Sequence, residues 1–420
     1  MIDLEHLRHN PDLYRKAIKQ KRIDLDLTVL LAQDAAVRDL RRQVDGLRAE
    51  RNRISARVAA GTLTRDEASL HSRTFSERLE LAEKELKGTE HAFAKLTALL
   101  PGLPAPDVPE GDGDEDNVEL YRRGKPAVCD FAQRDHVELA TLHGMVDFEA
   151  ARQAAGSRAY ALLGAGVLLE QALLRFAFDL VIGRGFTPVA PPLMVREQAM
   201  FGTGYFPLGE DNAYQLRDDD LYLTGTSEVG IMAMQAGRLL EVDKLPLRYV
   251  GMTTCFRSEA GSAGRDVKGL YRVHQFQKVE QIVIGPNDVE SSRQAHGEIL
   301  QNAEDILQAL ELPYRVVAVC AGDMGLGQVR KNDIETWMPS RKAYGETHSC
   351  STFHDFQARR LNLRYRDASG QKHYVHTLNN TAIASPRILI AFLENHQQKD
   401  GTIYIPPALR PYLSGRTAIQ

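Results

Sequence analysis

Apolar residues near the N-terminus follow a heptad spacing. In residues 36–60 they alternate at intervals of three and four, interrupted at Arg51, and occupy Val37, Leu40, Val44, Leu47, Ile54 and Val58. After Gly61, the segment Thr64 to Glu67 matches a capping box. The spacing then resumes at Phe75, Leu79, Ala82, Leu86, Phe93, Leu96 and Leu100. Two such helices joined by a short turn predict an antiparallel coiled-coil hairpin, an arm of roughly 40–50 Å at ~1.5 Å per residue.

A different pattern follows. Residues 101–117 (PGLPAPDVPEGDGDEDN) are rich in proline, glycine and acidic residues, which is typical of a linker. Beyond them, strand-like runs such as LRYVGMTTCFRSE and HQFQKVEQIVIG follow one another without an intervening helix. This favours an antiparallel β-sheet flanked by helices. We therefore expect an α+β chain with a helical N-terminal domain at 1–100, a linker at 101–117 and a sheet domain at 118–420.

Composition narrows the class of protein. A chain of 420 residues with 43% hydrophobic residues can bury a sizeable core, and its net charge of −4 means that any nucleic-acid surface must be local. The four cysteines lie far apart with no CxxC motif, which favours a reducing compartment and argues against structural zinc. No apolar run approaches the ~18 residues of a membrane span. Because the N-terminus is also charged, we expect a cytoplasmic protein.

Candidate chemistry lies in a predicted β-hairpin at residues 255–281. Arg257 and Glu259 stand two apart on one expected strand. Phe276, Lys278 and Glu280 do the same on the other, and a glycine-rich loop between them carries Arg265 and Lys268. Such a face suits a nucleotide, because arginine binds phosphate and phenylalanine stacks on a base. A solvated sheet face with ordinary ion pairs fits the same spacing.

Three further segments are polar. Thr224 to Glu228 ends a strand with hydroxyls and a carboxylate that suit an ammonium group. Residues 345–351 gather Glu346, His348 and Ser349, and residues 377–381 lead into a helix with Arg387. Each segment alone matches a turn or a cap. Together they supply carboxylates, hydroxyls and arginines, without a Ser/His/Asp order or a GxxxxGK[ST] phosphate loop.

These motifs carry a family resemblance. The segments FRSEAGSAGRDVKGLYRVHQFQKVE, TGTSEV, ETHSCS, DFQARR, TLNNTAIASPR and LENHQQKDGTIYIPPALRPY resemble the bacterial type of seryl-tRNA synthetase, a class II aminoacyl-tRNA ligase. The likeness covers essentially the whole chain, including the heptad hairpin. There are two departures: the family more often has TAE where this chain has Thr226-Ser227-Glu228, and the usually glycine-rich final motif has no glycine in residues 380–387.

The resemblance implies activation of L-serine with ATP and Mg²⁺ and transfer of serine to tRNA(Ser), and also to tRNA(Sec), by a catalytic domain at 118–420. Arg257 would hold the α-phosphate, Glu259 the adenine edge near Val273, and Phe276 would stack on the base. Arg387 would cover the other face of the base and reach the γ-phosphate. Glu346 and Ser349 would position Mg²⁺, a cation that prefers oxygen ligands. The catalytic residues implied are Arg257, Glu346 and Arg387, and the other implied ATP contacts are Ser258, Thr347 and His348.

For the amino acid, the resemblance implies Thr226, Ser227, Glu228, Arg257, Glu280, Asn379 and Thr381. Glu280 and Thr381 are expected at the substrate hydroxyl, because a pocket that hydrogen-bonds a hydroxyl rejects alanine strongly. The division of serine contacts among Thr226, Glu228, Glu280 and Thr381 stays open.

Two regions point to macromolecular partners. The apolar helix from Leu168 to Ile182 and the segment 185–192 resemble the class II dimerisation motif, which implies a homodimer; a plain core helix is the alternative. The first arm helix carries a stripe of arginines that includes Arg42, Arg48 and Arg53. With Arg265 and Lys268, it suits an RNA backbone. Without the sheet domain beside it, the arm would instead be interpreted as a solvated coiled-coil face or a protein-docking hairpin.

Two other functions compete. A paralogue that loads a carrier protein would have no use for the arm. A catalytically dead RNA-binding homologue would not need Arg257, Glu259, Glu280, Glu346 and Arg387 together.

Overall fold

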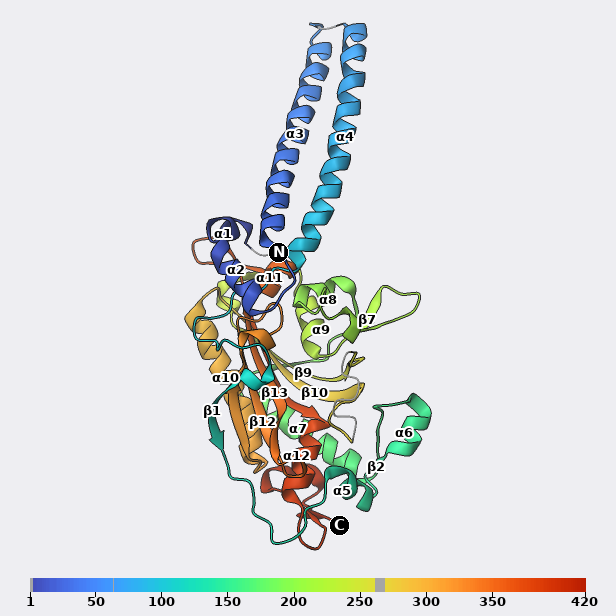
Figure 1. Cartoon of the computed structure of the whole chain (residues 1–420), viewed down its shortest axis with the longest axis vertical. Coiled ribbons are helices and arrows are strands. Elements are labelled where there is room, and N and C mark those ends of the chain that lie inside the picture. Colours follow the sequence, from blue (N-terminus) through green and yellow to red (C-terminus); the bar gives the residue numbers. More distant parts are fainter. Residues whose placement is uncertain (1–2, 63, 261–268) are drawn as a thin grey trace. The chain divides into compact units, whose positions relative to one another are not determined.

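Two long helices form most of the first part of the chain. The computed structural model describes residues 3–62, 64–260 and 269–420, and it divides the chain into two units, Met1–Pro101 and Gly102–Gln420. The helices of the first unit are α1 (Leu4–His9), α2 (Pro11–Gln20), α3 (Leu27–Ala59) and α4 (Arg65–Ala98). Figure 1 shows α3 and α4 side by side, running in opposite directions.

The predicted coiled-coil hairpin is confirmed. Apolar side chains from the two stripes are buried together, namely Val44, Leu47, Leu79 and Ala82, with Phe75 and Leu86 packed against them. The Asp26 carboxylate caps α3 by accepting hydrogen bonds from two backbone N–H groups. With 33 residues, α3 spans about 50 Å. The predicted capping box at residues 64–67 involves side chains that lie outside the described part of the chain.

The second unit is built on an eight-stranded sheet, as the predicted fold class requires. The strand order is β1-β11-β12-β13-β16-β10-β9-β4. Every pairing is antiparallel except that of β4 with β9. In that order the strands are Val118–Arg123, Tyr314–Ala318, Arg330–Met338, Ala343–His354, His376–Ser385, Gln275–Gly285, Leu247–Phe256 and Thr187–Val189.

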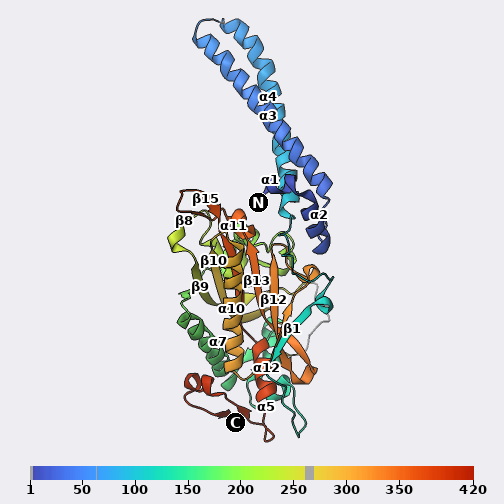
Figure 2. The same ribbon diagram turned by 90° about the vertical axis from the view of Figure 1, so that its left-hand side faces the viewer.

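Helices cover both faces of this sheet. On one face lie α7 (Ala165–Gly183) and α10 (Val289–Ala309), and with α12 (Arg387–His396) they enclose the largest apolar cluster. Figure 2 shows α10 lying over the sheet. On the other face, α9 (Ser227–Ala233) and α11 (Phe356–Leu361) pack on Ile282 and Ile284.

Smaller elements complete the second unit. The remaining helices are α5 (His136–Leu142), α6 (Phe148–Ala155) and α8 (Glu197–Thr203). The remaining strands are β2 (Val146–Asp147), β3 (Ala161–Leu162), β5 (Met194–Arg196), β6 (Tyr214–Gln215), β7 (Leu221–Leu223), β8 (Leu239–Glu241), β14 (Arg364–Arg366), β15 (Lys372–Tyr374), β17 (Ile403–Tyr404) and β18 (Ala418–Ile419).

The segment expected as a linker belongs to the second unit from Gly102 onward. The Gly102 N–H donates to the Leu326 carbonyl at 2.9 Å, and the Ala105 N–H donates to the Val329 carbonyl at 2.8 Å. Backbone hydrogen bonds thus hold its first residues against the sheet unit despite their linker-like composition.

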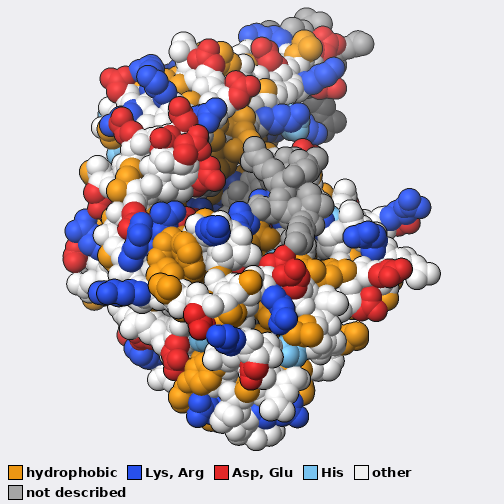
Figure 3. Space-filling view, turned by 60° about the horizontal axis from the view of Figure 1, so that its bottom comes forward, with side chains coloured by type: hydrophobic (Ala, Val, Ile, Leu, Met, Phe, Trp, Pro, Cys, Tyr) orange, Lys and Arg blue, Asp and Glu red, His pale blue; other side chains and the backbone are white. Residues whose placement is uncertain are grey.

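The surface is mixed in charge. Figure 3 shows Lys and Arg interspersed with Asp and Glu over one face, in keeping with the net charge of −4. Within the described residues, we find no helix that combines the length and the apolar character needed to cross a membrane. The four cysteines are free.

Candidate active site

The hairpin of β9 and β10 places three predicted residues on one face. Across the two strands, Phe276 pairs with Cys255 and Lys278 pairs with Thr253. Because alternate residues of a strand share a face, Phe276, Lys278 and Glu280 point the same way, as predicted. The Arg257 guanidinium lies over the Phe276 ring, with its carbon 5.2 Å from the ring centroid.

The other strand ends earlier than predicted. β9 stops at Phe256, so the expectation that Glu259 continues the strand is wrong. Glu259 has a φ of +54°, a left-handed conformation that is strained for a glutamate. Its carboxylate accepts a hydrogen bond from Arg272 Nη1 at 2.6 Å, and its carbonyl accepts one from Arg158 Nη1 at 3.1 Å. Two arginines thus hold this bend.

The residues around the bend are tied to neighbouring segments. The Arg257 N–H donates to the His274 carbonyl at 2.9 Å, which continues the pairing beyond the strand. The Ser258 hydroxyl donates to the Asp211 carbonyl, and Val273 is buried. Of the expected ATP contacts, the chain therefore gathers Arg257, Glu259 and Phe276 close to the buried Val273.

A β-bulge decides which side chains of β13 share a face. Ile334 of β12 pairs with His348, whereas Glu335 pairs with Glu346, so Thr347 is an extra residue in β13. Glu346 and Ser349 are three positions apart and would otherwise lie on opposite faces. The extra residue brings both to the same side.

The bulge turns the other two predicted side chains away. The Thr347 hydroxyl lies 2.6 Å from the Thr336 hydroxyl, and both side chains are buried. His348 is also buried, with its Nδ1 2.8 Å from the Thr347 hydroxyl, and burial lowers the pKa of its imidazole to about 4. The side chains of Thr347 and His348 therefore do not reach the face that carries Glu346.

Opposite charges converge on Glu346. Arg387, the first residue of α12, donates from Nη1 to the Glu346 carboxylate at 3.1 Å and to its carbonyl at 3.0 Å. Desolvation acts to raise the pKa of Glu346, but the charges of Arg387 and Lys331, with a smaller contribution from Arg257, lower it to about 2. These cations thus act on one carboxylate, which is ionised at neutral pH.

The oxygen donors next to Glu346 fit a hard divalent cation. Ser349 lies opposite Asp333 across β12 and β13, and Asp333 Oδ1 is buried with no hydrogen-bond partner among the described residues. Desolvation by burial raises the pKa of Asp333, although the positive charge of Lys331 opposes this shift. In the described part of the chain, no group of three or more His, Cys, Asp or Glu could hold a metal alone. Glu346 and Ser349 fit Mg²⁺ if phosphate oxygens complete the shell.

A second cluster is buried and acidic. Glu280 pairs with Thr381 across β10 and β16, and the Thr381 hydroxyl donates to Glu280 Oε2 at 3.2 Å. Lys278 Nζ lies 2.5 Å from the same oxygen, and both side chains of this ion pair are less than a tenth exposed. Two of the predicted serine contacts are therefore joined, and a buried lysine compensates the carboxylate.

Glu228 faces this cluster from α9. Its carboxylate accepts a hydrogen bond from Gln357 Nε2 at 2.6 Å. Desolvation raises the pKa of Glu228 to about 7; the bonds from Gln357 and Asn379 oppose this, and the charge of Glu280 adds to it. Glu228, Glu280, Asn379 and Thr381 thus form one electrostatic group, suited to a small molecule that carries an ammonium group and a hydroxyl.

The two residues that precede Glu228 differ in the hydrogen bonding of their hydroxyls. The Thr226 hydroxyl accepts from the Glu228 N–H at 3.4 Å and caps α9. The Ser227 side chain is fully buried against Gly251, where an added Cβ would come within 2.7 Å of its Oγ. Ser227 Oγ has no hydrogen-bond partner in the described structure.

Sequence reasoning assigned no role to three residues of this cluster. The sequence places Lys278 on the predicted hairpin and Gln357 in the motif DFQARR, but it indicates no function for either side chain. Burial raises the pKa of the third residue, Tyr205. The charges of Glu228, Arg257 and Glu280 also act on its hydroxyl, so Tyr205 lies near both the Arg257 side chain and the buried acidic cluster. No local spacing indicates that these residues meet.

The structure describes three of the predicted RNA-binding side chains, all of them on the arm. Arg42 and Arg53 form pairs within α3, with Asp39 and with Glu50, while Arg48 pairs across the hairpin with Glu83 at 2.7 Å. All three side chains are more than half exposed. Arg265 and Lys268 lie outside the described residues.

A groove of about 760 Å³ lies beside α7, where a dimer contact was predicted. Its lining includes Leu168, Ala190, Pro191 and Met252. Leu168 is 48% exposed and Met252 is 40% exposed. This surface presents apolar side chains from the predicted helix and from the segment that follows it.

Two family models match the chain. The model "Seryl-tRNA synthetase N-terminal domain" matches residues 1–104, and the model "tRNA synthetase class II core domain (G, H, P, S and T)" matches residues 213–396. A serine–tRNA ligase of Deinococcus radiodurans is 48% identical over 100% of this chain and 99% of its own length. One from Methanocella arvoryzae is 43% identical over 99% of both chains.

Solved structures agree. The chain is similar to a seryl-tRNA synthetase from Pyrococcus horikoshii complexed with ATP, with a TM-score of 0.92, 39% identity and coverage of 100% and 99% of the two chains. It is also similar to a cytoplasmic serine–tRNA ligase from Naegleria fowleri in complex with AMP, with a TM-score of 0.85, 28% identity and coverage of 98% and 96%.

Proposed function

We propose that this chain, which belongs to the seryl-tRNA synthetase family, is a serine–tRNA ligase. It activates L-serine with ATP to seryl-adenylate and pyrophosphate, and then transfers the seryl group to the 3′ end of tRNA(Ser). The same acceptor chemistry extends to tRNA(Sec).

One observation carries this proposal: a cationic group and a buried acidic group lie on one face of the sheet. The charges of Arg257 and Arg387 both act on Glu346, and the charge of Glu280 acts on Glu228. Arg257 also acts on Tyr205, as do both acidic residues of the second group. The first group suits polyphosphate and the second suits an amino acid, so the two substrates would meet between them.

Activation needs alignment and charge stabilisation more than proton transfer. A carboxylate oxygen of serine forms a bond to the α-phosphorus, the bond from that phosphorus to the bridging oxygen breaks, and pyrophosphate leaves. Arg257 would bind the α-phosphate where negative charge builds up. Phe276 would stack on the adenine beside Glu259. Arg387 would give up part of its hydrogen bonding to Glu346 and bind the γ-phosphate.

Mg²⁺ fits Glu346 and Ser349, which would hold it next to the phosphates. When bound, it would supply positive charge that offsets the negative charge of the phosphates.

The acidic pocket would select serine. Glu228 and the Thr226 region would receive the ammonium group, and Glu280 with Thr381 would receive the hydroxyl. Alanine would leave the buried Glu280–Thr381 pair without a partner, which costs about 1–3 kcal/mol. Lys278 holds one oxygen of Glu280 and thereby fixes the direction of the other.

Transfer to RNA involves the first unit. A terminal ribose hydroxyl of the tRNA attacks the seryl carbonyl, and AMP leaves. We assign tRNA binding to the helical part at 1–100, where Arg42, Arg48 and Arg53 would contact phosphates of a long RNA stem. The sheet part at 118–420 would be catalytic, with residues 101–117 between them. Such an enzyme works in the cytoplasm, where tRNA is charged.

The apolar groove beside α7 supports a homodimer. Exposed Leu168 and Met252 would be covered by a second copy of the chain. Replacing Met252 with Arg should shift the mass measured by light scattering from that of a dimer to that of a monomer. An unchanged mass would place the subunit contact elsewhere.

The direct test of the reaction is amino-acid-dependent exchange of labelled pyrophosphate into ATP. We expect exchange with serine and a rate lower by on the order of 10- to 100-fold with alanine or threonine. Exchange that prefers another amino acid, or that needs none, would contradict the proposal.

A further inference from the structure

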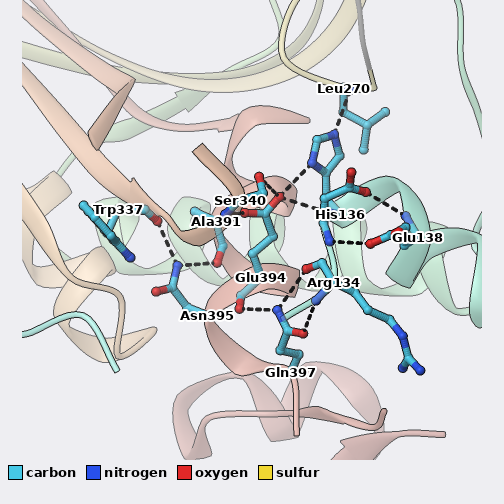
Figure 4. A network of polar contacts seen from close by, with 11 residues as sticks. Arg134, His136, Glu138, Leu270, Trp337, Ser340, Ala391, Glu394, Asn395 and Gln397 are labelled. Carbon is cyan, nitrogen blue, oxygen red and sulfur yellow. Dashed lines mark hydrogen bonds and ion pairs between the residues drawn. The ribbon is translucent and has the colours of Figure 1, made fainter. Parts of the chain in front are cut away.

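A buried carboxylate outside the two substrate groups joins three segments of the second unit. Figure 4 shows Glu394 of α12 between His136 and Ser340. Its Oε1 accepts from the His136 backbone N–H at 3.0 Å and from the Ser340 hydroxyl at 2.8 Å, and Oε2 accepts from the Ser340 N–H at 2.9 Å. The Glu394 side chain is 0% exposed. Four hydrogen bonds, with that of His136 Nδ1 at 2.9 Å, stabilise its charge.

The partners of His136 fix its tautomer. The Leu270 N–H lies 3.2 Å from His136 Nε2, and a backbone N–H can only donate. Nε2 must therefore be unprotonated, so the ring proton sits on Nδ1 and is donated to Glu394. A neutral imidazole thus links a carboxylate on α12 to the backbone at Leu270.

The chain passes His136 very closely at this point. Gly269 has a φ of +73°, and an added Cβ there would come within 2.1 Å of His136 Nε2. Only glycine permits this approach. Gly269 and Leu270 directly follow residues 261–268, and they precede the buried Val273 and the stacking residue Phe276.

The next residue reaches the phosphate side. The Tyr271 carbonyl accepts a hydrogen bond from Arg387 Nε at 3.1 Å, and the Arg387 guanidinium carbon lies 4.6 Å from the centre of the Tyr271 ring. Arg341, next to Ser340, lies over the same ring at 4.2 Å. Arg387 and Glu394 are seven residues apart on α12, about two turns, so they lie along one side of the helix.

We propose that His136, oriented by Glu394, is a positioning residue for ATP. It fixes the backbone at Leu270, which places Tyr271 against Arg387 and so aims Arg387 at the phosphates. The serine group does not depend on this link, since Glu280 and Thr381 are held by the sheet and Glu228 by α9. The inference rests on the proposed function, and its consequence is a defect in ATP use with serine binding retained.

Two substitutions separate the two nitrogens of His136. His136→Asn keeps a donor near the position of Nδ1 for Glu394 but has no atom that reaches Leu270. His136→Gln keeps an acceptor near the position of Nε2. His136→Asn loses the buried hydrogen bond from the Leu270 N–H. We therefore expect KM for ATP to rise on the order of fivefold to tenfold, while KM for serine stays within about twofold of the wild-type value. His136→Gln should recover most of this loss.

Gly269→Ala provides a second route should either histidine variant fold poorly. Its methyl group would overlap His136 Nε2 and must separate Leu270 from the imidazole, so the same ATP-selective defect is expected. Asn395→Ala is the matched control on the same helix. It removes hydrogen bonds to the Trp337 and Ala391 carbonyls, neither of which touches the Leu270 segment. It should lower the melting temperature with no change in KM for ATP.

Amide hydrogen exchange tests the link without catalysis. Peptides that cover residues 269–276 should exchange faster in His136→Asn and Gly269→Ala than in the wild type, and little faster in His136→Gln. Equal ATP defects in His136→Asn and His136→Gln, or unchanged exchange in this segment, would overturn the positioning role. A wild-type protein without serine-dependent pyrophosphate exchange would refute the proposed function instead, and the amide-exchange result would still stand.

Discussion

Ion pairs in the arm and ion pairs on the sheet face differ in how much water reaches them. Arg48 and Glu83 lie 2.7 Å apart across the coiled coil with side chains 52% and 42% exposed. Lys278 and Glu280 lie 2.5 Å apart with side chains 8% and 4% exposed. An exposed pair contributes about 0–1 kcal/mol, whereas removing one partner of a buried pair costs about 3–5 kcal/mol. The arm can therefore offer its arginines to a partner, whereas separating the buried Lys278–Glu280 pair on the sheet face would be costly.

The two regions also differ in whether the orientation of an arginine matters in addition to its charge. On the sheet face, an arginine is held in one orientation by packing, as Arg257 is over Phe276. On the arm, an arginine only has to supply positive charge within reach of a phosphate. Lysine keeps the positive charge of arginine but loses its planar fork. Substitution by lysine should therefore cost much activity on the sheet face and little on the arm.

The largest effect is expected at Arg257. Arg257→Lys should lower serine-dependent pyrophosphate exchange by about 100-fold or more, because one stabilising contact to the developing charge is lost. Circular dichroism should show an unchanged fold. Near-normal exchange would mean that charge alone suffices on the sheet face, and the contrast with the arm would disappear.

The arm should respond to charge alone. Replacing Arg42, Arg48 and Arg53 together by Gln should lower the rate of tRNA charging by about tenfold or more and reduce the salt dependence of tRNA binding, with pyrophosphate exchange unchanged. The matched triple substitution by Lys should retain most of the charging rate. A loss as large with Lys as with Gln would show that the arm reads geometry as well.

Thr381 tests the buried group with a smaller change. Thr381→Val keeps the shape but removes the hydroxyl that donates to Glu280. We expect a loss of about 1–3 kcal/mol in kcat/KM for serine, and little change in KM for ATP. Thr381→Ser, which keeps the hydroxyl, is the control. Unchanged serine kinetics in the valine variant would remove Thr381 from the proposed site.

Serine binding should also depend on pH near neutrality. Glu228 has a pKa raised to about 7 by desolvation, so its carboxyl is protonated below that pH and cannot attract the ammonium group. KM for serine should fall on the order of tenfold as the pH rises from about 6 to about 8. Glu228→Gln should bind serine weakly with no such dependence. A flat profile in the wild type would assign the ammonium group to another carboxylate.

The smallest effect concerns Ser227, where the family more often has alanine. Because its buried Oγ lacks a described partner, Ser227→Ala should stabilise the fold or leave it unchanged, by about 1 kcal/mol at most. Ser292→Ala is the contrasting variant, since the Ser292 hydroxyl lies 2.7 Å from His376 Nδ1. Thermal unfolding should show a loss in Ser292→Ala, and a comparable loss in Ser227→Ala would reveal a partner for that hydroxyl.

Local spacing in the sequence is enough to predict the helices of the arm and the strands of the sheet. The heptads predicted the α3–α4 hairpin, and successive strand-like runs predicted the antiparallel sheet, because both patterns follow from the residues per turn or per pleat. Alternation also placed Phe276, Lys278 and Glu280 on one face. It failed at Glu259, where the strand ends and the backbone adopts a left-handed conformation that no alternation indicates.

Which distant side chains meet, and which face of the sheet they share, depends on how the chain packs in three dimensions. One inserted residue at Thr347 brings Glu346 and Ser349 to the same side and sends Thr347 and His348 into the core. The bond from Gln357 to Glu228 spans 129 residues of sequence, and that from His136 to Glu394 spans 258. Such contacts are set by register and burial. Residues far apart in the chain are forced together when buried polar groups must find partners, and local spacing carries no record of that requirement.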